Sequence, residues 1–230
     1  MKAKLSGKEA WGYWPAYGVG LLDLRSVEGS HVLFSEFAGK ATLSIPGAFT
    51  HETESAKLKK GDLVLATIVT SGKCARIEEV TGESAKVSFI WGDKLDSRDF
   101  EMNKLLRLDG KLGFGAPTLR KNDVGEWFAG TLVYADAKTA WIAGEFMSPE
   151  AKAPVADVHP VDITKQRKKG DKVLACAFAM GGCAEVTIAG PLYGGLAYEV
   201  SLPKDMDNHE DPKAKTAIVD ACHMMSAPKK

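Results

Sequence analysis

The C-terminal region carries the densest alternation of side chains that could bind a metal ion. The alternating residues are Asp205, Asp207, His209 and Asp211. A calcium-binding loop of this pattern requires glycine at its sixth position and a bidentate carboxylate at its twelfth. Glu210 and Thr216 stand at these two positions instead. We therefore interpret the region as a solvated acidic loop and expect no metal site in it.

Two segments of the sequence are similar to enzyme motifs but lack residues that these motifs require. Ala38-Gly39-Lys40-Ala41 is similar to the end of a phosphate-binding loop, but Phe34 replaces its first glycine and Ala41 replaces its metal-binding hydroxyl residue. His51-Glu52-Thr53-Glu54 is followed by Ser55, where a metalloprotease helix has its second histidine. We therefore predict that the protein is not an enzyme and has neither catalytic residues nor a cofactor.

The four cysteines offer thiol chemistry but form no Cys-x-x-Cys pair. They are Cys74, Cys176, Cys183 and Cys222. Four such cysteines are too sparse for a disulfide framework, so we expect reduced and mostly buried thiols. A thiol- or metal-dependent enzyme that uses Cys176, Cys183 or Cys222 is a third hypothesis, after a binding protein and a scaffold protein.

Aromatic side chains are the strongest candidates for partner binding. Trp11, Tyr13, Trp14 and Tyr17 place four rings in seven residues. Exposed Trp and Tyr residues anchor protein interfaces and stack on bases, whereas the same rings can also fill the core of a small module. The candidate binding residues are Trp11, Trp14, Tyr17, Phe89, Trp91, Trp127 and Trp141. They predict a protein or peptide partner, and the core interpretation stays open.

Basic residues beside predicted strands suggest an alternative partner, a nucleic acid. The candidates for phosphate contacts are Lys59, Lys60, Arg76, Lys168 and Lys169, and Lys57, Lys165 and Arg167 are further positive residues beside them. The chain has 30 basic and 30 acidic residues and no formal net charge. Since phosphate contacts supply most nucleic-acid affinity, this balance makes nucleic acid the second choice. A scaffold protein without a small ligand is a further alternative.

An internal repeat with an offset of 109 residues organises these candidates. Lys59-Lys60-Gly61-Asp62 recurs as Lys168-Lys169-Gly170-Asp171, Val64-Leu65-Ala66 as Val173-Leu174-Ala175, and Cys74-Ala75 as Cys183-Ala184. With Gly72 and Gly181 these make ten identities in register, while Phe89 is replaced by Tyr198. The chain is therefore predicted to be a tandem duplication. The repeated Cys74 and Cys183 favour a packing role, because a nucleophile is seldom needed twice.

Short strands with tight turns dominate both halves. Runs of β-forming residues at 63–69, 74–80 and 86–91 predict a meander, and Phe100 to Arg107 reads as a helical or 3₁₀ turn before a last short strand. We expect four small modules at 1–55, 56–112, 113–164 and 165–204. A C-terminal appendage would follow over 205–230, with a helix from Lys213 to His223.

The strand pattern resembles that of a known family. Gly61 to Ala66, Ala75 to Val80 and Val87 to Asp93 are similar to the strands of Tudor domains, and Gly125 to Val133 is similar to the second strand of Agenet domains. The resemblance implies an all-β fold of tandem, duplicated pairs of SH3-like barrels. Members of that family commonly bind methylated lysine or arginine in an aromatic cage.

The resemblance does not extend to a complete cage. Ile68 and Ala177 stand at the first cage position, and Lys73 and Gly182 stand near the next. Because cation–π selectivity needs several ring faces, we expect no methyl-lysine cage in these modules. The expected function is therefore non-enzymatic recognition through aromatic surfaces or the grooves between barrels.

Composition and patterning exclude several classes of protein. A hydrophobic content of 45% and a charged content of 26% are typical of a folded globular chain. No apolar run reaches membrane-spanning length, and residues 1–7 lack the apolar stretch of a secretory signal. We expect a cytoplasmic protein without membrane partners, and the sequence leaves its oligomeric state open.

Overall fold

The structure is a computed structural model that describes residues 5, 7–15, 18–35, 42–53, 57–69, 71–144, 150–177, 180, 182–204, 206 and 208–227. These residues form an all-β protein with short 3₁₀ helices, as the sequence predicts. Asp205 and Asp207 of the expected acidic loop, and the loop-like motif at 38–41, lie outside the described residues. None of the described helices is long and apolar enough to cross a membrane.

The described residues fold into four consecutive antiparallel sheets of five strands each, numbered blades 1 to 4. Blade 1 contains β1 (Glu9–Trp14), β2 (Gly18–Glu28), β3 (His31–Ser35), β4 (Thr42–Pro46) and β5 (Thr50–Glu52). Blade 2 contains β6 (Leu63–Ile68), β7 (Ser71–Thr81), β8 (Ser84–Trp91), β9 (Lys94–Glu101) and β10 (Leu105–Arg107). Blade 3 contains β11 (Pro117–Lys121), β12 (Trp127–Ala135), β13 (Thr139–Gly144), β14 (Ala151–Pro154) and β15 (Val158–Pro160). Blade 4 contains β16 (Lys172–Ala177), β17 (Gly182–Leu192), β18 (Ala197–Ser201), β19 (Thr216–Asp220) and β20 (Met224–Ser226).

Each blade is a four-stranded meander whose chain returns to the starting edge. A 3₁₀ turn follows the fourth strand, and the short fifth strand then pairs antiparallel with the first. These turns are η2 (Gly47–Phe49), η3 (Met102–Lys104), η4 (Val155–Asp157) and η7 (Ala221–His223). The turn predicted after Phe100 is η3, and the last short strand predicted there is β10.

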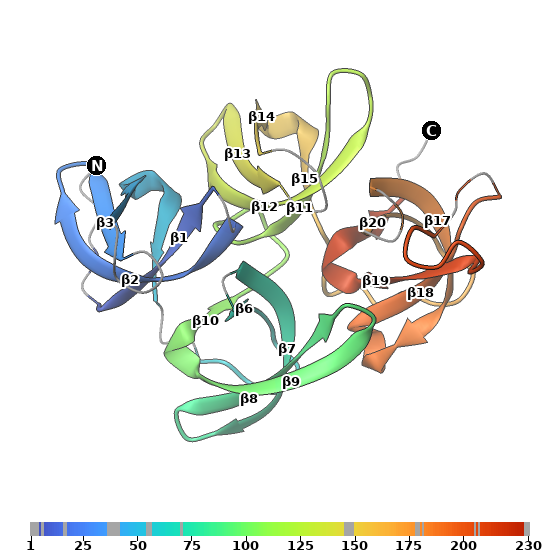
Figure 1. Cartoon of the computed structure of the whole chain (residues 1–230), viewed down its shortest axis with the longest axis horizontal. Coiled ribbons are helices and arrows are strands. Elements are labelled where there is room, and N and C mark those ends of the chain that lie inside the picture. Colours follow the sequence, from blue (N-terminus) through green and yellow to red (C-terminus); the bar gives the residue numbers. More distant parts are fainter. Residues whose placement is uncertain are drawn as a thin grey trace.

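The four sheets are arranged as a four-bladed β-propeller (Figure 1). The expected tandem SH3-like, Tudor-like or Agenet-like barrels are therefore wrong, because no sheet closes. In blade 1 the order is β4-β3-β2-β1-β5, so that β4 and β5 lie at opposite edges and are not paired. A barrel requires these edges to pair. The sequence pattern of a meander with a short final strand is common to both architectures.

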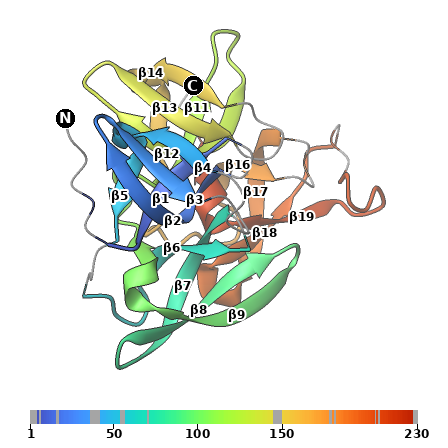
Figure 2. The same ribbon diagram turned by 60° about the vertical axis from the view of Figure 1, so that its left-hand side comes forward.

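The blades do not follow one another around the ring. Blade 1 contacts blade 2, where the Leu21 backbone N–H donates to Thr67 Oγ1 at 2.8 Å, and blade 3, where Phe49 lies 5.4 Å from Trp141. Blade 4 contacts blade 2 through Arg76 and blade 3 through η7 and β11. Blades 1 and 4 thus lie on opposite sides, and Figure 2 shows blade 1 between blade 3 above and blade 2 below. The two duplicated halves lie side by side.

The centre of the ring is filled with apolar side chains. Each blade contributes from its first strand, and the buried residues include Trp11, Leu65, Leu119 and Leu174. Leu65 and Leu174 occupy equivalent positions of the internal repeat. Separate apolar clusters lie within the individual blades. The shared centre stabilises the ring through burial of apolar surface, which is the dominant favourable term in folding.

The C-terminal region completes blade 4 and is not an appendage. Thr216–Asp220 is a strand paired with β18, and Met224–Ser226 pairs with β16. The expected helix from Lys213 to His223 is wrong. Ala217 and Val219 alternate with less buried neighbours, and this period of two fits a half-buried strand.

The cysteines form two disulfide bonds, Cys74–Cys222 and Cys176–Cys183, and none is free. The expectation of reduced thiols is therefore wrong for this structure. Cys176 and Cys183 are directly opposite each other on β16 and β17. Cys74 and Cys222 are 148 residues apart in the sequence and lie in different blades. Local spacing does not reveal either pairing.

Candidate functional site

The structure places two of the aromatic candidates in the core. Trp11 and Phe89 are both 0% exposed, the first in the central cluster and the second within blade 2. Trp14 is partly buried against the core of blade 1. Tyr17 lies outside the described residues. The core interpretation of the N-terminal rings therefore holds for Trp11.

The remaining aromatic candidates are distributed over separate parts of the surface. Trp91 is 49% exposed at the end of β8, and Trp141 is 37% exposed beside Phe49. Trp127 is partly buried, with its ring centroid 5.4 Å from that of His159. The Lys152 ammonium lies 5.6 Å from the centre of the Trp141 ring. These side chains share no pocket among those described.

Arg76 is occupied by contacts between blades 2 and 4. Its Nη1 donates to the carbonyl of Gly194 and its Nη2 to that of Tyr193, each at 3.0 Å. Nε and Nη2 also donate to Glu78 Oε1. The guanidinium is therefore part of the blade junction, and we remove it from the phosphate-binding candidates.

The repeated Lys-Lys-Gly-Asp sequence forms the same turn in blades 2 and 4. The backbone N–H of Lys59 donates to Asp62 Oδ2 at 3.0 Å, and that of Lys168 donates to Asp171 Oδ2 at 3.0 Å. The glycines of the two turns have φ of 90° and 91°, which favours glycine over other residues. Lys59, Lys60, Lys168 and Lys169 are all exposed. The repeat therefore preserves a turn that leads into the first strand of the blade.

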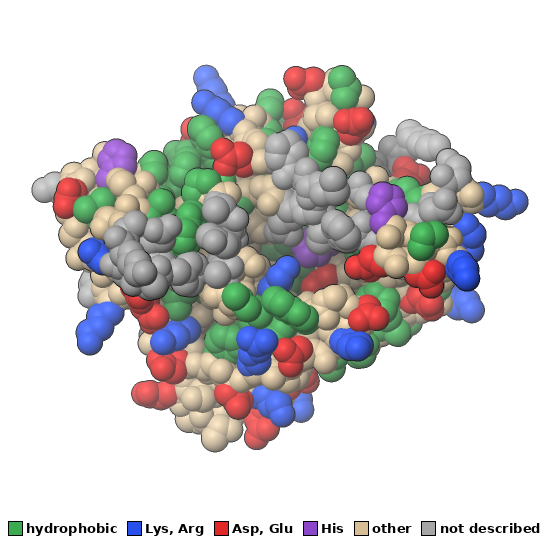
Figure 3. All heavy atoms as spheres, viewed as in Figure 1, with side chains coloured by type: hydrophobic (Ala, Val, Ile, Leu, Met, Phe, Trp, Pro, Cys, Tyr) green, Lys and Arg blue, Asp and Glu red, His purple; other side chains and the backbone are tan. Residues whose placement is uncertain are grey.

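A basic pocket of about 650 Å³ lies beside this turn in blade 4. Its lining residues are Lys165, Gln166, Arg167, Lys168, Asp171, Lys172 and Ser226. Four of them are cations and one is a carboxylate. Lys165 Nζ donates to Ser226 Oγ at 2.8 Å, which leaves further ammonium hydrogens for a ligand. Acidic and basic side chains are interspersed over the face of the protein shown in Figure 3. The lining of this pocket is instead mostly positive.

Arg167 provides the buried cation of the pocket. The residue is 6% exposed, and its Nη2 donates to the Met224 carbonyl at 3.2 Å. Its backbone N–H donates to the Tyr198 hydroxyl at 3.1 Å. Burial lowers the pKa of the guanidinium, while the charges of Tyr198, Asp162 and Asp171 act in the opposite direction. Arginine nevertheless stays charged at ordinary pH.

The equivalent position in blade 2 holds an apolar residue instead of the buried cation. At the repeat offset, Leu58 corresponds to Arg167 and Phe89 to Tyr198. Leu58 is 7% exposed and packs within the apolar cluster of blade 2. The turn therefore folds equally well over an apolar residue, and the arginine of blade 4 is not required by the turn.

A second difference between the blades concerns the side chain that faces the turn carboxylate. Arg107 pairs with Val64 in blade 2, and Ser226 pairs with Val173 in blade 4. Arg107 Nη2 lies 3.4 Å from Asp62 Oδ1. The smaller Ser226 leaves the corresponding space beside Asp171 open, and it lines the pocket. The pocket of blade 4 thus depends on several differences from blade 2, and two further cations, Lys165 and Lys172, correspond at the repeat offset to Ala56 and Leu63.

A smaller pocket of about 170 Å³ lies where the link between blades 2 and 3 meets β5 of blade 1. His51 and Phe114 line it, with stacked rings whose centroids are 5.6 Å apart. His51 Nδ1 is 2.8 Å from the backbone carbonyl of Glu52. The remaining lining is mostly the linker itself, from Leu106 to Pro117. This pocket has less volume and fewer charges than the basic one.

Sequence reasoning identified Lys165, Arg167 and Lys168 as positive residues beside a strand and missed Lys172 and Ser226 of the basic pocket. The burial of Arg167 was not expected, because charges before a strand are ordinary surface residues. The signal lay in the differences between the repeats. Arg167 replaces the apolar Leu58, and Tyr198, which carries a hydroxyl, replaces Phe89. These differences mark the site at which blade 4 departs from blade 2.

No known protein-family model matches the chain, and no curated protein matches it in sequence.

Proposed function

We propose that the protein is a non-enzymatic binding protein whose ligand carries a phosphate group, held in the basic pocket of blade 4. The observation that carries the proposal is the buried Arg167 beside Lys165, Lys168 and Lys172 in one pocket. A guanidinium matches two phosphate oxygens at once, and the lysines add strong point charges. The pocket thereby supplies both the geometry that orients a phosphate group and the positive charge that attracts it.

The comparison of the two repeats supports a ligand role for Arg167. Burying the Arg167 cation costs free energy that the nearby charges of Asp162 and Asp171 offset only in part, since burial still lowers its pKa. Replacing buried ionic groups by apolar ones is often neutral or stabilising. Blade 2 has the apolar alternative, Leu58, in the same turn. A bound anion would offset the cost in blade 4.

The test is a calorimetric titration of the wild type and of the Arg167→Leu/Tyr198→Phe variant, which gives blade 4 the residues of blade 2. Inorganic pyrophosphate and a single-stranded oligonucleotide are the two probes. Loss of a hydrogen bond to a charged group costs about 1.5–3 kcal/mol, which corresponds to an affinity about tenfold to a hundredfold lower. We expect the variant to fold with unchanged or slightly higher stability.

The lysines of the two turns supply a matched control. Lys168→Ala should weaken binding, whereas Lys59→Ala in the equivalent turn of blade 2 should leave it unchanged. Oligonucleotide binding that falls with salt, with a log–log slope of about −2 to −3, would identify a nucleic-acid backbone as the source of the phosphate. Binding of pyrophosphate alone would identify a small phosphate compound. If neither probe binds, or the double variant binds both as tightly as the wild type, the proposal is wrong.

A protein partner is a second candidate, favoured by the exposure of two large aromatic side chains. Trp91 and Trp141 retain 49% and 37% of their surface. Tryptophan is enriched among the residues that dominate interface energies. Partners captured by the wild type should be lost with Trp91→Ala or Trp141→Ala, in the presence of nuclease. Equal capture by both variants would exclude these side chains as anchors.

A further inference from the structure

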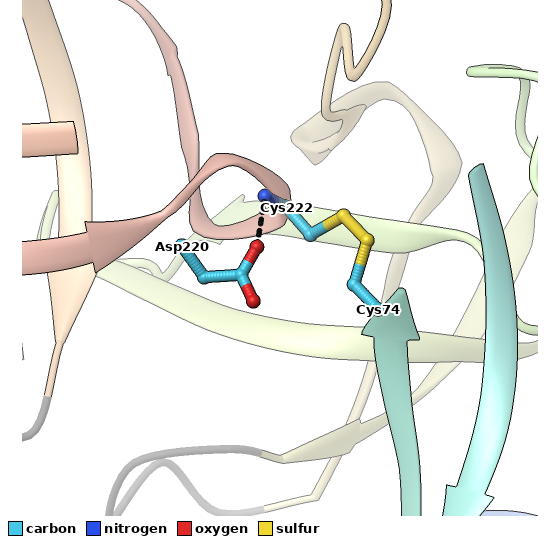
Figure 4. Close-up of a disulfide and its surroundings, with 3 residues drawn as sticks. All are labelled: Cys74, Asp220 and Cys222. Carbon is cyan, nitrogen blue, oxygen red and sulfur yellow. Dashed lines mark hydrogen bonds between the residues drawn. A yellow bond between two sulfur atoms is a disulfide. The ribbon is translucent and has the colours of Figure 1, made fainter. Parts of the chain in front are cut away.

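Two sulfur atoms and a carboxylate from different blades meet in the centre of the ring. Cys74 lies on β7 of blade 2, Asp220 ends β19 of blade 4, and Cys222 lies in the adjoining η7. One ligand atom of each residue lies within 4.8 Å of the other two. Figure 4 shows the Asp220 carboxylate beside the disulfide, where Oδ1 accepts a hydrogen bond of 2.8 Å from the Cys222 backbone N–H.

The second cysteine pair of the chain lacks this arrangement. Cys176 and Cys183 are cross-strand neighbours with Cα atoms 4.0 Å apart, against 6.3 Å for Cys74 and Cys222. Among the described residues, only the Cys74 pair has a carboxylate close enough to act as a third ligand. Two thiolates and a carboxylate are a ligand set that suits zinc, with Zn–S bonds near 2.3 Å. An ion can bind between the two sulfur atoms only after their S–S bond is broken.

We propose that Cys74, Cys222 and Asp220 bind one divalent metal ion of the zinc type when their disulfide is reduced. A dithiol reductant supplies two electrons and two protons, the S–S bond breaks, and two thiols form while the reductant becomes a disulfide. The thiols then lose their two protons as both sulfurs bind the ion. A water molecule completes a tetrahedral site. Blades 2 and 4 are thereby linked in either redox state, by a covalent bond or by a metal ion.

The surroundings favour the ion over two free thiols. Cys74 and Cys222 are 7% and 1% exposed and belong to the apolar central cluster. Thiolates are poorly solvated there unless a cation balances them. Asp220 adds a negative charge whose orientation is already set by the Cys222 backbone. The divalent ion therefore satisfies three groups that blades 2 and 4 hold close together.

The test uses the full-length Cys176→Ala/Cys183→Ala variant, in which only the proposed ligand cysteines remain. Cobalt(II) is the probe, because thiolate coordination gives it intense absorption bands. We expect one cobalt ion per chain after reduction and none in the oxidised form of the same protein. Zinc should displace the cobalt with the same stoichiometry. The oxidised form is the matched control and requires no further substitution.

Asp220→Asn in the same background separates the carboxylate from the sulfurs. Removing even an outer partner of a metal ligand costs about 10- to 100-fold in affinity, so loss of a direct ligand should weaken cobalt binding at least about tenfold. Reduced protein that takes up no cobalt, or takes up as much when oxidised, would overturn the proposal. Unchanged affinity in Asp220→Asn would remove the carboxylate from the site and contradict the proposed ligand set.

Discussion

Replacing Cys74 and Cys222 with alanine should destabilise the protein much more than replacing Cys176 and Cys183. The first pair connects blades 2 and 4 across 148 residues, and the second closes a hairpin with a separation of 7. A crosslink restricts the unfolded chain, and this restriction grows with the length of the loop that it closes. At least three of the four side chains are buried, so the packing losses of the two double variants are similar.

The chain-entropy relation gives the size of the difference. A separation of 148 residues corresponds to about 5 kcal/mol and a separation of 7 to about 2.5 kcal/mol. Since 1 kcal/mol shifts the melting temperature of a protein of this size by about 2–4 °C, Cys74→Ala/Cys222→Ala should melt about 10–20 °C lower than the wild type. Cys176→Ala/Cys183→Ala should lose about half as much.

Urea unfolding under oxidising conditions, with a chelator present, measures both variants against the wild type. The slope of the free energy against urea concentration shows whether each variant still unfolds as one unit. Equal losses in the two double variants would refute the loop-length reasoning. A negligible loss on removal of Cys74 and Cys222 would show that the central apolar cluster alone holds blades 2 and 4 together.

Three further predictions concern packing, the blade junction and pH. A Cβ atom on Gly130 would collide with Ile142 and the Ala143 carbonyl, so Gly130→Ala should cost about 3 kcal/mol in urea unfolding, whereas Gly190→Ala, in open space, should stay within about 0.5 kcal/mol. Arg76→Ala should cost about 2–3 kcal/mol because it breaks the bonds between blades 2 and 4. Arg98→Ala loses an exposed ion pair with Asp96 and a cation–π contact with Phe89, both within blade 2, and should cost only about 1 kcal/mol. The backbone N–H groups of Lys138 and Thr139 lower the pKa of Asp136, so this carboxylate stabilises the protein above its unfolded pKa and loses that effect as pH falls through the folded value. Asp136→Asn should therefore flatten the acid side of the stability profile, and an unchanged profile would exclude this carboxylate as a cause.

Strands, turns and the duplication were predictable because they depend on local patterns. The two Lys-Lys-Gly-Asp turns and the short strand after Phe100 follow from glycine, aspartate and alternating apolar residues. The barrel expectation failed because closure depends on whether β4 meets β5, and no local residue pattern specifies that. The helix expected near Lys213 failed because pairing with β18 outweighed local preference.

The candidate site was only partly predictable for a related reason. The sequence shows that Trp11 and Phe89 are aromatic, but it does not show which face of its strand each side chain occupies. Both side chains are buried in the structure. Arg167 has the appearance of a surface charge in the sequence and becomes buried only when Tyr198 and β20 pack around it. The disulfide between Cys74 and Cys222 depends on a contact between blades, which spacing along the chain cannot reveal.

A crystal structure grown with tungstate, a heavy analogue of phosphate, tests the central claim most directly. Tungsten scatters anomalously, so that its position is determined independently of the protein. The account predicts one strong anomalous peak in the basic pocket, with a tungstate oxygen about 3 Å from the Arg167 guanidinium and a second near the Lys168 ammonium. An empty pocket at saturating tungstate, with peaks only elsewhere on the surface, would contradict the assignment of this pocket as the phosphate site.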